Sequence, residues 1–155
     1  MLVPITINRR QWLAGALLLP IVGMADQPQL PLVEVWKDPS CGCCKDWVAI
    51  LEQARFPVRV YETGNNAMRA QLGIPTKLGS CHTARVEGYA IEGHVPVREI
   101  KRLLREKPQA IGLTVPGMVV GSPGMDGPIY KGRKDPYTVM LMLPNGSAVD
   151  YQRYG

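Results

Sequence analysis

With 155 residues, of which 46% are hydrophobic and 20% charged, the chain can form one domain with an ordinary hydrophobic core. The formal net charge is +5, but the basic residues are scattered and few aromatic residues accompany them, which is typical of a solvated surface and argues against nucleic-acid binding. The sequence contains no Ser/His/acid arrangement, phosphate-binding loop or convincing carboxylate pair, so nothing in it supports a hydrolase or a kinase.

The first 25 residues have the features of an export signal. Arg9 and Arg10 precede an apolar run over residues 12–22, and small residues at 23 and 25 favour cleavage near Ala25. The run is too short to span a bilayer and the segment contains no acidic residue, although an uncleaved N-terminal anchor stays open as the alternative. We therefore predict a twin-arginine-like signal over residues 1–25, and no membrane-spanning segment after its removal.

Three of the four cysteines, Cys41, Cys43 and Cys44, lie within four residues of one another. The segment before them, 32–36, has the β-branched alternation of a strand, and apolar residues at helical spacing predict a helix over about 43–55. Cys41 is thus expected at the N-terminus of a helix, where unpaired N–H groups and the helix dipole favour the thiolate. A thiolate is the form that binds soft metals and attacks disulfides.

The next elements predict an α/β core over residues 26–109. We expect a strand at 57–61 parallel to the first, a short helix at 65–72, a hairpin of strands 83–86 and 89–93, and a helix that begins at 95–97. The order β-α-β-α-β-β-α is that of the thioredoxin fold, in which the loop before the third strand packs against the reactive cysteines. Cys81, followed directly by His82, lies in that loop. Its sulfur is therefore expected to meet those of the other three cysteines.

Residues 110–155 exceed a minimal thioredoxin domain and are predicted to form a C-terminal extension that packs on the core. A Pro/Gly-rich loop repeats Pro-Gly-Met seven residues apart and presents Met118 and Met125, which belong to no apolar stripe. A thioether is a good Cu(I) ligand, so both methionines are candidate ligands as well as candidate packing residues. Strands at 137–143 and 148–151, joined by a turn, complete the predicted extension.

Four thiolates from two loops would make a soft metal site, which selects Cu(I), zinc or an iron–sulfur cluster. A mononuclear zinc site usually draws two cysteines from each of two turns, whereas the split here is three and one. Three sulfurs within four residues crowd a single tetrahedral ion, and thiolates that each bridge two Cu(I) ions relieve that crowding. We therefore expect a small Cu(I)–thiolate cluster of more than one ion, with one zinc ion or two structural disulfides as open alternatives.

The same cysteines support a second function. Cys41 and Cys44 form a Cys-x-x-Cys motif, which on a thioredoxin-like fold is the motif of thiol–disulfide oxidoreductases. Against this interpretation, Cys43 places a third thiol beside the pair and would allow disulfide scrambling. Cys81 also stands where thioredoxin-like proteins usually carry the cis-proline that presents substrate thiols. A thiol–disulfide oxidoreductase stays an alternative, and an enzyme that changes the oxidation state of copper would combine both interpretations.

Four motifs occur together in the chain: Cys-x-Cys-Cys-x-x-Trp after a strand, Gly-Ser-Cys-His-Thr-Ala, Tyr-x-Ile-Glu-Gly-His-Val-Pro, and a late Val-Pro-Gly-Met…Gly-Ser-Pro-Gly-Met with Asp-Pro-Tyr. Together they resemble the CopG-type copper-resistance proteins of Gram-negative bacteria, over about residues 33–151. The resemblance implies a thioredoxin-like fold, a periplasmic location and copper bound by the cysteines. The matching positions are Cys41, Cys43, Cys44, Cys81, His82, His94, Met118 and Met125.

The two histidines are the least determined of these candidates. His82 would point to the opposite face from Cys81 if both lay on one strand, so a core or surface role agrees with the sequence as well as metal binding does. His94 ends the hairpin ahead of the last core helix and is assigned to copper chiefly by the resemblance. Copper ions and other periplasmic copper-handling proteins are the expected partners, while sequestration, transfer and redox conversion all stay open.

Overall fold

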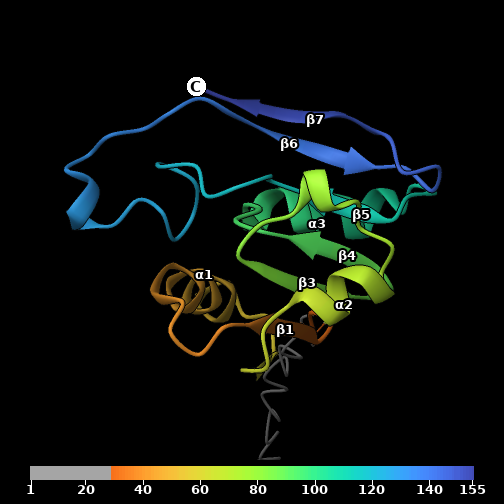
Figure 1. The fold of residues 1–155 in the computed structure, drawn as a ribbon, viewed down its shortest axis with the longest axis horizontal. Helices are drawn as coiled ribbons and strands as arrows, with labels where there is room; N and C mark the ends of the chain where they lie inside the picture. The colour runs from red at the N-terminus through yellow and green to blue at the C-terminus, as the bar shows by residue number, and fades with distance from the viewer. Residues whose placement is uncertain (1–28) are drawn as a thin grey trace, which may run out of the picture.

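The structure, a computed structural model, describes residues 29–155, so the predicted export signal lies outside the described residues. A single sheet of seven strands, in the order β2-β1-β3-β4-β5-β6-β7, runs through this part of the chain (Figure 1). The strands are β1 (Val33–Lys37), β2 (Val58–Tyr61), β3 (His82–Val86), β4 (Tyr89–Glu92), β5 (Gly112–Thr114), β6 (Tyr137–Met142) and β7 (Ala148–Tyr154). The helices are α1 (Gly42–Gln53), α2 (Asn66–Gln71) and α3 (Val97–Glu106), with two short 3-10 turns, η1 (Thr76–Leu78) and η2 (Pro128–Tyr130).

The mixed α/β class is confirmed. The first seven helices and strands follow the predicted order β-α-β-α-β-β-α, with bounds close to those expected. β1 pairs in parallel with β2 and antiparallel with β3, and β3 and β4 form the predicted hairpin. α3 then connects β4 to β5, which are parallel neighbours, as a helical crossover requires.

Helices cover both faces of the sheet. The buried residues of α1 follow the spacing i, i+3, i+4, i+7 of one helix face: Cys44, Trp47, Val48 and Leu51. α3 adds its buried stripe to the same main core, and a smaller cluster under the segment after α2 lies on the other face. Consecutive residues of β4, Ala90 and Ile91, contribute to the two clusters in turn, as the alternation of a strand predicts. In Figure 1, α2 lies in front of the sheet and α3 behind it.

The C-terminal residues extend the core sheet edge to edge. β5 pairs with β4, β6 with β5, and β7 forms the far edge. The sequence predicts no strand at β5, because a three-residue strand followed closely by Pro116 has too little pattern to detect. The two later strands match the prediction closely. The division of the chain at residue 109 stays a prediction.

The loop between β5 and β6 returns across the molecule to the end of α1 that carries the cysteines (Figure 1). We call residues 115–127 of this connection the covering loop. Gly124 has φ +83° and lies against the α1 backbone, where an added Cβ would stand 2.8 Å from the Cys43 carbonyl oxygen and 2.9 Å from the Trp47 nitrogen. Only glycine suits both this backbone conformation and this close approach.

Within residues 29–155, no helix combines the length and the apolar character that a membrane span needs.

Candidate metal centre

The turn between β1 and α1 places three cysteines at the start of a helix. Cys41 is the N-cap residue of α1, as predicted, and its N–H donates to the Asp38 carbonyl oxygen at 3.1 Å. The Asp38 carboxylate accepts from the Ser40 N–H at 2.8 Å and from the Ser40 hydroxyl at 2.5 Å, and these bonds lower the pKa of Asp38. This local network sets the direction in which the chain enters α1, and therefore where the Cys41 sulfur lies.

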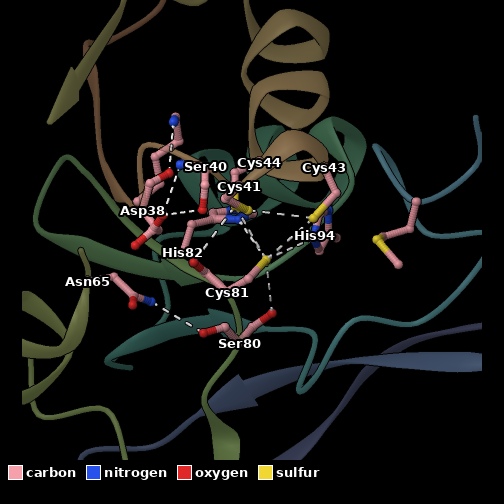
Figure 2. The surroundings of a disulfide bond; sticks show 12 residues. Asp38, Ser40, Cys41, Cys43, Cys44, Asn65, Ser80, Cys81, His82 and His94 are labelled. Atoms are coloured by element: carbon pink, nitrogen blue, oxygen red, sulfur yellow. Dashed lines mark hydrogen bonds between the residues drawn. A yellow bond between two sulfur atoms is a disulfide. The ribbon is translucent and has the colours of Figure 1, made fainter. Parts of the chain in front are cut away.

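The sulfurs of all four cysteines lie within 4.8 Å of one another (Figure 2). Cys41 and Cys44 form a disulfide, while Cys43 and Cys81 carry free thiols. The Cys81 sulfur is 3.5 Å from that of Cys44 and 4.0 Å from that of Cys43, which in turn is 3.6 Å from that of Cys41. The predicted meeting of Cys81 with the α1 cysteines is thus confirmed, and one of the two disulfides of the structural alternative is present.

His94 is held against the Cys81 sulfur by the covering loop. Its Nε2 lies 3.1 Å from the Cys81 sulfur, and its Nδ1 lies 2.8 Å from the Pro123 carbonyl oxygen of the covering loop. A carbonyl only accepts, so Nδ1 carries the proton and Nε2 presents a lone pair toward the sulfur. Burial lowers the pKa of His94, which keeps the ring neutral and able to bind a metal.

His82 also faces the cluster, which corrects our expectation that it points away from Cys81. Its Nδ1 lies 3.5 Å from the Cys81 sulfur, and its ring packs 4.3 Å from that of Trp47 and 5.0 Å from that of His94, measured between centroids. The expectation failed because β3 begins at His82, so the alternation of strand side chains does not extend back to Cys81. Burial, and then the neighbouring His94, lowers the pKa of His82 well below its usual value.

A buried carboxylate fixes the loop that carries Cys81, and sequence analysis missed it. Glu92 accepts from Arg69 Nε at 2.8 Å, from the Ser80 N–H at 2.7 Å and from the Thr83 hydroxyl at 2.5 Å. The Arg69 guanidinium also donates to the Ser80 carbonyl oxygen. Burial raises the pKa of Glu92, and these hydrogen bonds together with the Arg69 charge oppose that rise. Both backbone polar groups of Ser80, the residue before Cys81, are thus held by one ion pair.

The covering loop closes over this arrangement and separates the two candidate methionines. Ser80 donates through its hydroxyl to the Gly117 carbonyl oxygen, and the Gly117 N–H donates to the Gly79 carbonyl oxygen at 3.0 Å. Met125 is buried and its sulfur accepts from the Tyr130 hydroxyl at 3.3 Å, whereas Met118 is 58% exposed. Met125 therefore belongs to the interior of the loop and Met118 to its surface.

The donor set suits a soft ion. Burial, and then the nearby Cys43, raises the pKa of the Cys81 thiol to about 12, so a metal that binds this sulfur must displace a proton. Four sulfurs and two neutral imidazoles then surround one small region of the protein. Thiolates of this kind prefer Cu(I) or zinc to hard cations.

Comparisons with known proteins identify the family. A family model described as "Protein of unknown function, DUF411" matches residues 78–125, which include Cys81, both histidines and both methionines of the covering loop. A search of curated proteins finds no match. Two solved structures, titled "Copper resistance protein copG- Form 2" and "Form 1", each share 40% sequence identity with this chain at a TM-score of 0.74. Each match covers 81% of this chain, and 99% and 98% of the respective solved chains. The chain therefore belongs to the family of the copper resistance protein CopG.

Proposed function

We propose that this chain is a periplasmic copper-binding protein of copper resistance that holds more than one Cu(I) ion in a thiolate cluster. The observation that supports this most directly is the gathering of four cysteine sulfurs within 4.8 Å, on a chain similar to copper resistance proteins. Cys41, Cys43, Cys44 and Cys81 would bind the copper. His94 is the strongest additional ligand, and His82, Met118 and Met125 stay candidates.

Several Cu(I) ions suit this arrangement better than a single ion does. Three of the sulfurs come from one turn of helix, so a lone tetrahedral ion cannot use all of them without strain. Thiolates that bridge neighbouring Cu(I) ions share their electron pairs and place each sulfur between two metals. Full loading requires the Cys41–Cys44 disulfide to be reduced, because a disulfide sulfur is not a thiolate ligand.

The exposure of the site suits transfer as well as storage. Cys41, Cys43 and Cys81 are each only partly buried, so incoming ligands can reach their sulfurs. Copper can therefore pass to a partner protein by stepwise ligand exchange. The same set of thiols could also take part in redox conversion of copper, so sequestration, transfer and conversion are alternative uses of one site.

A Cu(I) titration of the reduced protein, against a chromophoric Cu(I) chelator, tests this proposal. We expect more than one Cu(I) per chain, together with loss of reactive thiols as copper is added. Cys81→Ser should remove at least one Cu(I) equivalent, because it deletes the one sulfur of the four that does not come from the turn between β1 and α1. Ile129→Ser, at an 81% exposed position, is the control and should bind as the wild type does. Binding of one zinc ion in preference to copper would overturn the proposal.

One observation favours a second function, a thiol–disulfide oxidoreductase. Cys41 and Cys44 are bonded to each other at the N-terminus of α1, where a dithiol pair of that class would stand. This function predicts that metal-free protein reduces or forms disulfides in a model substrate, and that Cys41→Ala abolishes the activity. An inactive metal-free protein that still binds several Cu(I) ions would exclude it.

A further inference from the structure

Two groups of potential metal ligands share the Cys81 sulfur. The first consists of the four cysteines, and the second of Cys81, His82 and His94, whose ligand atoms also lie within 4.8 Å of one another. The Cys41–Cys44 disulfide removes two sulfurs from the first group but none from the second. The oxidised chain therefore keeps a different set of donors from the reduced chain.

The second group is arranged for ligation while the disulfide is closed. His94 Nε2 lies 3.1 Å from the Cys81 sulfur. This nitrogen bears the lone pair because Nδ1 donates its proton to the Pro123 carbonyl oxygen. His82 Nδ1 is 3.5 Å from the same sulfur, and Cys43 brings its free thiol to 4.0 Å. These four atoms come from α1, from the residues on either side of the start of β3, and from the turn after β4.

His82 adds an independent observation. It is fully buried, and within the described chain its Nε2 has no hydrogen-bond partner. Its other ring nitrogen, Nδ1, lies 3.5 Å from the Cys81 sulfur, and with the proton on Nε2 it can offer its lone pair to an ion beside Cys81.

We propose that the oxidised protein retains a one-ion site formed by Cys81, His94, His82 and Cys43, which takes a divalent ion of the zinc or copper(II) class. The inference deepens the proposed function, since the redox state of the Cys41–Cys44 pair then selects between this site and the multi-ion Cu(I) site. The two sites cannot be filled independently, because both use the Cys81 sulfur.

The difference between the two donor sets decides the class of ion. Two thiolates with two imidazoles form a borderline set that suits zinc and copper(II), whereas four thiolates form a soft set that suits Cu(I). Conversion of one set to the other is a two-electron step. A dithiol reductant supplies two electrons and two protons, the Cys41–Cys44 bond breaks, both sulfurs become thiols, and the reductant leaves as a disulfide.

Titration of the oxidised protein with Co(II) tests the inference, because thiolate-bound tetrahedral Co(II) gives a charge-transfer band and intense visible bands. The starting material is metal-free protein shown by thiol titration to contain two free thiols. We expect one Co(II) per chain, displaced by one Zn(II). His94→Gln and His82→Gln should each weaken Co(II) binding at least about tenfold, by analogy with losses at other metal sites.

If these histidine variants fold poorly, the double variant Cys41→Ser/Cys44→Ser provides a second test. It cannot form the Cys41–Cys44 disulfide, but it keeps all four proposed ligands of the one-ion site. It should bind one Co(II) with the same spectrum in the presence and absence of reductant. Failure of folded, oxidised wild type and of this variant to bind Co(II) would overturn the inference while leaving the Cu(I) proposal intact. Co(II) binding by the oxidised protein, with no Cu(I) binding by the reduced protein, would instead overturn the proposed function and support this site.

Discussion

The two halves of the metal centre are built in different ways. The helix half consists of Cys41, Cys43 and Cys44, which consecutive residues of one strand–turn–helix unit bring together. The loop half consists of Cys81 and His94, which lie on segments with little regular structure of their own. Residues distant in the sequence hold the loop half in place.

This difference separates the residues that bind the metal from the residues that hold them in position. In the helix half, the helix start that presents the sulfurs is a local feature and should survive changes elsewhere in the protein. In the loop half, Cys81 depends on the Arg69–Glu92 ion pair and His94 depends on the Pro123 carbonyl oxygen. Substitutions far from any sulfur should therefore damage the loop half alone.

The largest expected effect follows from replacing Arg69 by methionine. The variant leaves the fully buried Glu92 carboxylate without its counter-charge and removes one of the two side-chain donors to the Ser80 carbonyl oxygen, so we expect the free energy of unfolding at pH 7 to fall by about 3 kcal/mol. Cu(I) binding should weaken as Cys81 loses its position. Chemical denaturation and Cu(I) titration measure the two losses.

The pH dependence of this loss identifies its cause. Burial raises the Glu92 pKa and Arg69 opposes that rise, so removing Arg69 moves the folded-state pKa higher. A carboxyl whose pKa is raised on folding stabilises the protein below that pKa and loses the contribution as the pH rises through it. The loss of unfolding free energy in the Arg69→Met variant should thus be smaller at pH 5 than at pH 7.

Arg153→Met, which breaks an exposed pair with Asp150, is the control and should cost at most about 1 kcal/mol. A deficit independent of pH would contradict this account.

The same division explains how much of the site could be predicted from the sequence. The place of Cys41 at a helix start follows from local pattern, and the meeting of Cys81 with the other sulfurs follows from the order of the elements. The Arg69–Glu92 pair left no signal, because its members are 23 residues apart and each resembles an ordinary surface charge. Only the pairing of β3 with β4 brings Ser80 within reach of Glu92.

The fold shows a similar limit. The α/β core could be predicted because each of its elements carries its own periodicity and is bounded by proline, glycine or asparagine. The joining of β5, β6 and β7 to the core sheet could not, because strand neighbours are chosen by tertiary packing and β5 has only three residues. Asn65 illustrates the same competition, since it stands at the N-cap position of α2 but donates its side-chain amide to Ser80 and Thr83 and makes no capping hydrogen bond.

An intermediate effect is expected at Gly124, where the covering loop touches the helix half. An alanine there would place its Cβ 2.8 Å from the Cys43 carbonyl oxygen and push the loop, with Pro123, away from α1. We expect a loss of about 2 kcal/mol in stability, at a φ of +83° that already disfavours side chains. Release of the His94 Nδ1 bond should also weaken Cu(I) binding.

Gly117→Ala is the matched control for that variant. Gly117 has φ +75° in the same loop, but an added Cβ would meet nothing within 4 Å. It therefore carries the same backbone cost, about 1 kcal/mol, without the contact with α1. If the two variants lost equal stability and bound Cu(I) equally, the covering loop would have no role in positioning His94.

The smallest expected effect distinguishes the two methionines of the covering loop. Met125→Leu nearly conserves side-chain volume, so the fold should lose less than about 1.5 kcal/mol, but the buried thioether of the covering loop would disappear. Because Met125 is buried in the loop and Met118 is 58% exposed, we expect Met125→Leu to weaken Cu(I) binding several-fold and Met118→Leu to leave it unchanged. Competition with a Cu(I) chelator measures both affinities, and Met140→Leu, a substitution in β6, controls for the loss of any thioether. Weaker binding in Met118→Leu alone would show that the surface methionine, and not the interior one, completes the site.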